Sequence, residues 1–222
     1  MAQVSLDQMV QALKAKPTLV SFPTDTVPAL AAVPSQAGLI FEAKQRSPEK
    51  PLILMGASLS DLLPYVSGPD TAMAEWQSIA LRHWPGQLTL VLPASDLAPK
   101  NLNPRPTADS AGTIGIRVPD HPIALALLTQ IGPLATTSAN LSGQPALTDV
   151  SAIAKTFPNA LTLKPAVLDP AVLDPAALDS AALDAAPNPK HSQSKTVSGM
   201  PSTVAKWMSP GWQILRQGNI RL

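Results

Sequence analysis

The chain of 222 residues contains no cysteine. This absence excludes a disulfide-stapled scaffold, a catalytic thiol and any cysteine-based metal site. Charged residues make up only 14% of the chain, below the usual share of about 25%, whereas its 25 prolines are about twice the usual number. No apolar run approaches the roughly 18 residues of a membrane span. The start, MAQVSLDQMVQALKAK, lacks the basic segment and apolar block of a secretion signal. We therefore expect a cytoplasmic protein with no membrane partner.

Several signatures of nucleotide and metal sites are also missing. The chain has no GxxxxGK[ST] loop, no strand–GxGxxG–helix unit and no HExxH pair, and its three histidines lack the spacing of metal ligands. We therefore predict no metal held by protein side chains. Any nucleotide site in this chain must be of a kind other than the P-loop.

The unusual composition is concentrated in residues 165–189, which contain PAVLD, PAVLD, PAALD and SAALD in tandem. A continuous helix is disfavoured because Pro170 and Pro175 each remove a backbone N–H and clash with the preceding turn. A small solenoid with inward-facing leucines would need more turns than four five-residue units supply. We interpret the segment as a mobile, low-complexity insertion at about residues 165–195, within a single domain that spans 1–222.

The acidic residues of this segment lower the net charge of the whole chain, so the rest of the chain is more basic than the total indicates. The whole chain has 16 basic and 15 acidic residues, a formal charge of +1. Four of the aspartates and none of the basic residues lie in 165–189, so the remainder carries a formal charge of +5. A mildly basic domain suits a small polyanionic ligand or RNA, although surface solvation alone would also account for it.

Apolar periodicity alternates between helix and strand along the chain. Helical spacing of apolar residues predicts a helix over 5–15, and residues 18–22 are typical of a buried strand. Similar patterns predict helices at 36–45, 58–65, 71–83, 123–130 and 149–156, and strands at 52–55, 87–92, 113–118, 134–137, 160–163, 202–205 and 213–216. Interleaved helices and strands indicate an α/β fold, and the short connections do not require every strand to be parallel. We predict an open mixed sheet with flanking helices.

Polar segments follow two of these strands, at the position where open α/β sheets place ligands. The PTDT sequence at 23–26 puts two hydroxyls and a carboxylate into a turn, although a capping turn would use the same residues. The SANLSG sequence at 138–143 offers hydroxyls, an amide and a glycine that could bring backbone N–H groups close to a phosphate or a purine. A helix cap followed by a turn would account for it equally.

Basic residues stand in two informative places. Lys44, Arg46 and Lys50 lie within seven residues, KQRSPEK, directly before an apolar strand. Charge clusters are usually solvated surface, but the flanking prolines favour a fixed loop in which an arginine fork and lysine charges bind phosphate. Arg117 lies inside an otherwise apolar strand, where a charge is costly unless it is paired or bound to an anion. We therefore favour a functional role for Arg117.

Six motifs occur in the order PTDT, KQRSPEKPLIL, WPGQLTLVLPA, GTIGIRVPDHP, TTSANLSGQPA and PSTV…ILRQG. Together they resemble the YrdC-type threonylcarbamoyl-AMP synthase family over about residues 5–163 and 200–218. The chain looks like the short, single-domain bacterial form. The resemblance implies a twisted, open α/β sheet around a concave, basic cavity.

The resemblance also implies a reaction. L-threonine, bicarbonate and ATP, with Mg²⁺, would give L-threonylcarbamoyl-AMP and diphosphate. The product would feed the threonylcarbamoylation of adenosine beside the anticodon of certain tRNAs, through downstream tRNA-threonylcarbamoyl transferase proteins. Both substrates and the leaving diphosphate are anionic, so catalysis would rest on positioning and electrostatics. The carbamate oxygen of a carboxylated threonine could attack the α-phosphate directly, with no obvious general base.

By similarity, the site residues fall into three groups. The predicted catalytic residues are Lys44, Arg46 and Arg117. The predicted threonine site comprises Thr24, Thr26, Arg117, Thr136 and Ser202. The predicted ATP site comprises Arg46, Lys50, Thr113, Ser138, Asn140, Ala146 and Arg216.

The chain departs from the family pattern after PTDT. It continues Val-Pro-Ala-Leu where the family often has Val-Tyr-Gly-Leu, so Pro28 stiffens the wall behind the threonine pocket and Ala29 limits positive φ. Met55 stands where other branches carry a histidine. Two alternatives stay open. The residues Pro28 and Ala29 are compatible with a paralogue that has a weak or different carbamoyl-adenylating activity, and the basic core and the cavity implied by the family are compatible with a module that binds tRNA or double-stranded RNA. Steep salt dependence would identify RNA binding.

Overall fold

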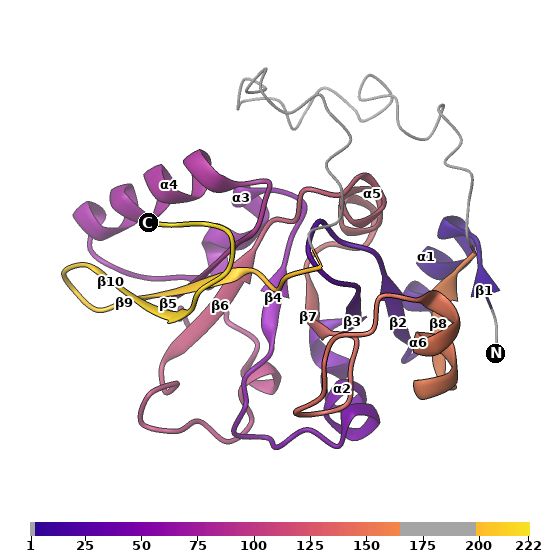
Figure 1. Cartoon of the computed structure of the whole chain (residues 1–222). Coiled ribbons are helices and arrows are strands. Elements are labelled where there is room, and N and C mark those ends of the chain that lie inside the picture. Colours follow the sequence, from indigo (N-terminus) through magenta and orange to yellow (C-terminus); the bar gives the residue numbers. More distant parts are fainter. Residues whose placement is uncertain (1–2, 165–198) are drawn as a thin grey trace.

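A computed structural model of the chain describes residues 3–164 and 199–222. The insertion expected at about 165–195 lies outside the described residues. A ten-stranded open sheet runs through the molecule in the order β1-β8-β2-β3-β7-β4-β6-β5-β9-β10 (Figure 1). Four neighbouring pairs are parallel and five are antiparallel. The predicted α/β class and mixed sheet are confirmed.

The element bounds follow the predicted periodicity closely. The strands are β1 (Gln3–Val4), β2 (Leu19–Phe22), β3 (Ala29–Ala32), β4 (Ile53–Met55), β5 (Leu88–Pro93), β6 (Thr113–Arg117), β7 (Leu134–Ser138), β8 (Ala160–Leu163), β9 (Thr203–Trp207) and β10 (Trp212–Arg216). The α-helices are α1 (Leu6–Ala15), α2 (Gly38–Lys44), α3 (Leu59–Leu62), α4 (Asp70–His83), α5 (Pro122–Ile131) and α6 (Val150–Thr156). Short 3₁₀ helices lie at Pro34–Gln36, Leu63–Tyr65 and Lys100–Leu102.

Strand β3 was not predicted, because its sequence Ala-Leu-Ala-Ala has none of the β-branched or aromatic residues that strands favour. It pairs antiparallel with both β2 and β7 and is buried throughout. Leu30 and Ala32 pack into one core, and Ala29 and Ala31 into the other. A strand covered on both faces needs small or apolar side chains rather than an alternating pattern. Ala29 is extended here, so the alanine after Pro28 causes no strain.

The helix predicted over 58–65 is shorter than expected. It begins with a capping box, in which the Asp61 N–H donates to Ser58 Oγ and the Ser58 N–H donates to Asp61 Oδ2. It ends at Leu62, and a 3₁₀ turn that contains Pro64 follows. The proline supplies no N–H for a continuing α-helix, which accounts for the change.

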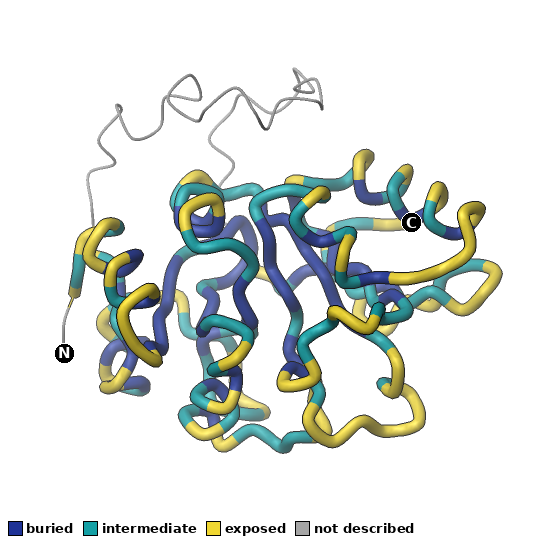
Figure 2. The backbone as a smooth tube through the Cα atoms, turned by 180° about the vertical axis from the view of Figure 1, so that it is seen from behind, coloured by how far each residue is buried: buried dark blue, intermediate teal, exposed yellow. Residues whose placement is uncertain are grey.

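The two faces of the sheet are covered unequally. Helices α2, α3, α4 and α6 pack against one face, with Ile40, Leu62, Trp76 and Ile153 among the buried contacts. On the other face, α1 and α5 cover the region of β2, β3 and β7. Figure 2 shows the central strands as the buried part of the backbone, with exposed residues on helices and loops. None of the helices in residues 3–164 and 199–222 has the length and apolarity that a bilayer crossing requires.

Side chains alternate between the faces of a strand, so β4, β5, β6 and β9 also present residues to the face that α1 and α5 leave partly open. On β5 and β6, Leu90 and Ile116 point into the covered core, whereas Thr89, Gly115 and Arg117 point to the open side. The functional cavity lies on this open part of the sheet.

We predict that Leu127→Ala will lower the free energy of unfolding by about 2–5 kcal/mol, because this fully buried α5 side chain fills the core that supports the open face. Leu81→Ala on α4 is the matched control, since Leu81 is 60% exposed and its truncation should change stability by less than about 0.5 kcal/mol. Urea denaturation of both variants measures the difference, and similar losses would contradict the assignment of α5 to the core.

Candidate functional site

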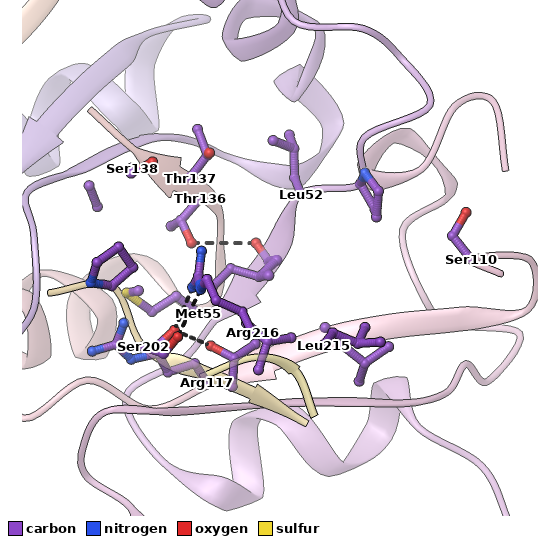
Figure 3. A pocket seen from close by; sticks show the side chains of 18 of the residues that line it. Leu52, Met55, Ser110, Arg117, Thr136, Thr137, Ser138, Ser202, Leu215 and Arg216 are labelled. Carbon is purple, nitrogen blue, oxygen red and sulfur yellow. Dashed lines mark hydrogen bonds between the residues drawn. The ribbon is translucent and has the colours of Figure 1, made fainter. Parts of the chain in front are cut away.

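A cavity of about 440 Å³ opens over β4, β5, β6 and β9 (Figure 3). Its walls come from the loop after β2, the loop before β4, the loop before β6, and the residues around β9 and β10. Gly115 lies on the floor of the cavity, where it has no side chain to occupy the space. A Cβ at this position would lie 2.9 Å from Cγ2 of Ile53, its neighbour on β4. The cavity therefore depends on the packing of adjacent strands as well as on its loops.

A buried ion pair stands at the end of β6. Arg117 Nη2 lies 2.7 Å from Asp25 Oδ1, and each side chain is only 4% exposed. The same guanidinium donates from Nη1 to Thr26 Oγ1 at 3.0 Å and from Nε to the Gly86 carbonyl at 2.9 Å. Burial lowers the pKa of Arg117, and the Asp25 carboxylate opposes this shift. The buried charge that the sequence indicated is therefore paired within the protein, while Arg117 still lines the cavity.

The PTDT turn holds itself together through its hydroxyls. Thr24 Oγ1 donates to the Val27 carbonyl at 2.7 Å and accepts the Thr26 N–H at 3.2 Å. The Asp25 carbonyl accepts from Gln87 Nε2 at 2.9 Å, which ties the turn to the segment before β5. Thr24 and Thr26 both line the cavity. The same residues thus act as turn formers and as cavity walls.

Lys44, at the end of α2, is fully buried behind the cavity rather than on its wall. Its Nζ donates to the carbonyl oxygen of Ser138 and, at 3.1 Å, to Asn140 Oδ1. Ser138 Oγ donates to the same Asn140 oxygen at 2.6 Å. Burial and the nearby Arg46 lower the pKa of Lys44 to about 7. In this arrangement Lys44 shapes the loop after β7.

Two further guanidinium groups, from segments far apart in the sequence, reach the cavity. Arg46 donates from Nε to the Lys50 carbonyl and from Nη2 to the Pro51 carbonyl, both at 3.0 Å. Arg216 donates from Nε to the Ser202 carbonyl at 2.9 Å and from Nη2 to Ser202 Oγ at 3.1 Å. Partial burial lowers the pKa of both. Figure 3 shows Arg216 and Ser202 together beside Arg117.

The structure brings most of the predicted site residues to one cavity. Its lining includes Thr24, Thr26, Arg46, Thr113, Arg117, Thr136, Ser138, Ser202 and Arg216. Lys44 and Asn140 lie behind Ser138, through the contacts above. Lys50 and Ala146 are not among the lining residues, and the Lys50 side chain is exposed. The roles of all these residues toward ligands stay predictions.

Other lining residues were missed. Thr89 lies on the floor, and its hydroxyl is 2.9 Å from that of Ser202. The sequence pattern that could have identified Thr89 is Gln-Leu-Thr-Leu, in which a polar residue alternates with leucines. In a strand, this alternation places the threonine on the face opposite the leucines. Thr107, Asp109 and Ser110 line the wall from an irregular loop, where no periodicity could place them.

We predict that the buried Lys44 makes stability depend on pH. Its pKa is about 7 in the folded chain against an ordinary value of 10.5, so unfolding takes up a proton between these values. The free energy of unfolding should therefore rise with pH above 7, by at most about 1.4 kcal/mol per unit from this group. Lys44→Met removes the titration, so urea denaturation at three pH values from 6 to 9 should show a shallower profile for the variant. Parallel profiles would contradict the shift.

Comparisons with known proteins agree with this geometry. The family model described as "Telomere recombination", Sua5/YciO/YrdC, matches residues 14–192. A threonylcarbamoyl-AMP synthase of Bacillus subtilis is 43% identical over 140 residues, which are 61% of this chain and 38% of that protein. A Vibrio cholerae protein of the same name is 39% identical over 146 residues, which are 64% of this chain and 74% of that protein.

A solved structure has a similar fold. Sua5 of P. abyssi, complexed with L-threonine, superposes with a TM-score of 0.70 at 27% identity, over 97% of this chain and 55% of that one. The chain thus spans well under two thirds of the Bacillus and P. abyssi proteins, and about three quarters of the Vibrio protein. From the order of its motifs, the mixed sheet and these matches, the chain belongs to the Sua5/YciO/YrdC family.

Proposed function

We propose that the chain is an L-threonylcarbamoyl-AMP synthase, a nucleotidyltransferase that uses L-threonine, bicarbonate and ATP. The observation that carries the proposal is the convergence of Arg46, Arg117 and Arg216 on one cavity that is also lined by hydroxyl groups. Three guanidinium groups in one cavity suit anionic substrates and charge that develops on a phosphate. The names of the Bacillus and Vibrio relatives support the same activity.

Threonine would occupy the part of the cavity beside the PTDT turn. The complex of P. abyssi Sua5 with L-threonine supports a threonine site in this family. In this chain, the hydroxyl-bearing residues and the guanidinium that we assign to threonine are Thr24, Thr26, Arg117, Thr136 and Ser202. Arg117 uses three of its five N–H groups in the bonds to Asp25, Thr26 and Gly86. We assign the other two to the threonine carboxylate.

ATP would lie toward Arg46 and the loop after β7. We assign it to Arg46, Lys50, Thr113, Ser138, Asn140, Ala146 and Arg216. The amine of threonine and bicarbonate form a carbamate with loss of water. A carbamate oxygen then bonds to the α-phosphorus, and the bond from that phosphorus to the bridging oxygen breaks. Diphosphate leaves with the electron pair. The guanidinium groups stabilise the charge on the phosphates, so the chemistry rests on positioning.

We propose Mg²⁺ as a companion of ATP rather than as an ion held by the protein. Within residues 3–164 and 199–222, no three His, Asp or Glu side chains are grouped to hold a metal. The cavity lining does include two carboxylates, Glu49 and Asp109. This donor set fits an ion held mainly by phosphate oxygens and water. Bound there, Mg²⁺ would neutralise part of the phosphate charge.

The product would be passed to tRNA-threonylcarbamoyl transferase proteins, which join it to an adenosine of tRNA. Direct binding of tRNA or double-stranded RNA by this chain has less support, because the basic groups that converge do so inside a cavity of small-molecule size. RNA binding is therefore an outcome that the assay below must separate from synthase activity.

We predict that Arg46→Ala will reduce threonine-dependent diphosphate release from ATP by about tenfold to 150-fold. The basis is the loss of a charge-assisted phosphate contact of about 1.5–3 kcal/mol. Its melting temperature should stay close to that of the parent protein, since within the described residues the Arg46 side chain bonds only to two carbonyls of its own loop. Arg221→Ala, at an exposed position outside the cavity, is the matched control.

Two outcomes would contradict the proposal. Near-normal turnover of Arg46→Ala with a lowered melting temperature would show that Arg46 has a structural role. Diphosphate release at the same rate with and without threonine would exclude the synthase assignment. Tight, salt-sensitive RNA binding without turnover would exclude it as well.

A further inference from the structure

Two buried polar atoms have no hydrogen-bond partner within the described residues, one on the residue that pairs with Arg117 and one on the segment that follows Arg117. They are Asp25 Oδ2 and His121 Nδ1. The other carboxylate oxygen of Asp25 is the one that pairs with Arg117. An unpaired buried polar atom costs on the order of 1–3 kcal/mol, and native proteins leave few of them. Two such atoms of complementary chemistry in one region point to a shared interaction.

His121 stands where the chain turns from β6 into α5. It occupies the N-cap position of α5, yet its side chain makes no capping bond. Its carbonyl accepts the Leu125 N–H at 2.9 Å, which is the first bond of the helix, and Pro122 begins the helix directly after it. The ring is therefore free of the usual task of a residue at this position. Three residues lie between it and Arg117, so His121 and the guanidinium that pairs with Asp25 belong to the same segment of the chain.

The charges around the ring support a link to Asp25. Burial lowers the pKa of His121, whereas the carboxylates of Asp25 and Asp120 raise it. The downward shift keeps the imidazole neutral at pH 7. A neutral imidazole carries one N–H, and a carboxylate oxygen is the acceptor that such a group needs.

We propose that His121 is a positioning residue whose Nδ1–H donates to Asp25 Oδ2 through one water, and so fixes Asp25 against Arg117. With both oxygens engaged, the carboxylate cannot turn about its own axis, and the direction of the Arg117 guanidinium is set. The chain of contacts then runs from the start of α5 through the PTDT turn to the cavity.

A small cavity of about 130 Å³ lies beside Asp25 and beside Asp120, the residue that precedes His121. Gly86 and Gln87 also line it, whereas His121 itself does not, and its volume is enough for a water with polar partners. The other charged or titratable residues that line it are Arg82, His83 and Asp120. The pKa of His83 is lowered by burial and by Arg82, so this histidine serves as an internal reference for His121.

The first test needs no substrate. Long-range ¹H–¹⁵N NMR of the imidazole rings reports which nitrogen carries the proton and the pKa of each ring. We expect His121 to carry its proton on Nδ1 at pH 7. In Asp25→Asn its pKa should fall, because the carboxylate that raises it is gone, while the pKa of His83 stays in place. A proton on Nε2 alone, or an unchanged pKa of His121, would overturn the proposal.

The second test uses threonine affinity and so rests on the proposed function. His121→Phe removes the donor, and His121→Asn keeps a donor at the place of Nδ1. Calorimetry should show threonine binding weakened about tenfold in the phenylalanine variant, equivalent to about 1.4 kcal/mol, and largely restored in the asparagine variant. Equal affinities in the two variants would overturn the proposal. If the parent protein binds no threonine, the proposed function fails, and the NMR result alone decides the role of His121.

Discussion

The buried pair of Arg117 and Asp25 joins three segments that the chain order keeps apart. One partner ends β6, the other lies in the turn after β2, and the guanidinium also reaches the carbonyl of Gly86 before β5. Both charges are almost fully buried, so the loss of either partner would leave an uncompensated charge in the interior. The same guanidinium also holds the Thr26 hydroxyl, so the turn after β2 and the segment before β5 are both tied to the end of β6 at this point.

The unequal covering of the sheet determines where chemistry can take place. Four helices close one face, and α1 with α5 close only part of the other. On the open side, β5 and β6 present Thr89, Val91, Thr113, Gly115 and Arg117, whereas the residues that alternate with them enter the core. A change of register by one residue would move Arg117 into the apolar core and Ile116 into the cavity. The fold and the site are thus two consequences of the same alternation.

Much of this was predictable from the sequence, for physical reasons that can be named. Periodicity located nearly all helices and strands, and the polar segments after strands located the PTDT turn and the loop after β7. A lone arginine in an apolar strand required a partner. That Asp25 is the partner could not be predicted, since 92 positions separate the two and only the strand order brings them together. The position of Lys44 could not be predicted either, since a lysine that ends a short helix can turn inward, and its contacts place it behind Ser138. Its catalytic role stays a prediction.

A double-mutant cycle on Asp25 and Arg117, followed by urea denaturation, measures whether this pair organises the structure. Each single change to alanine should lower the free energy of unfolding by about 3–5 kcal/mol, because each leaves a buried charge unpaired. The double variant should lose clearly less than the sum, since the charge that remains in either single variant is then gone. Losses that simply add, within about 0.5 kcal/mol, would show that the two residues act independently and would contradict the account.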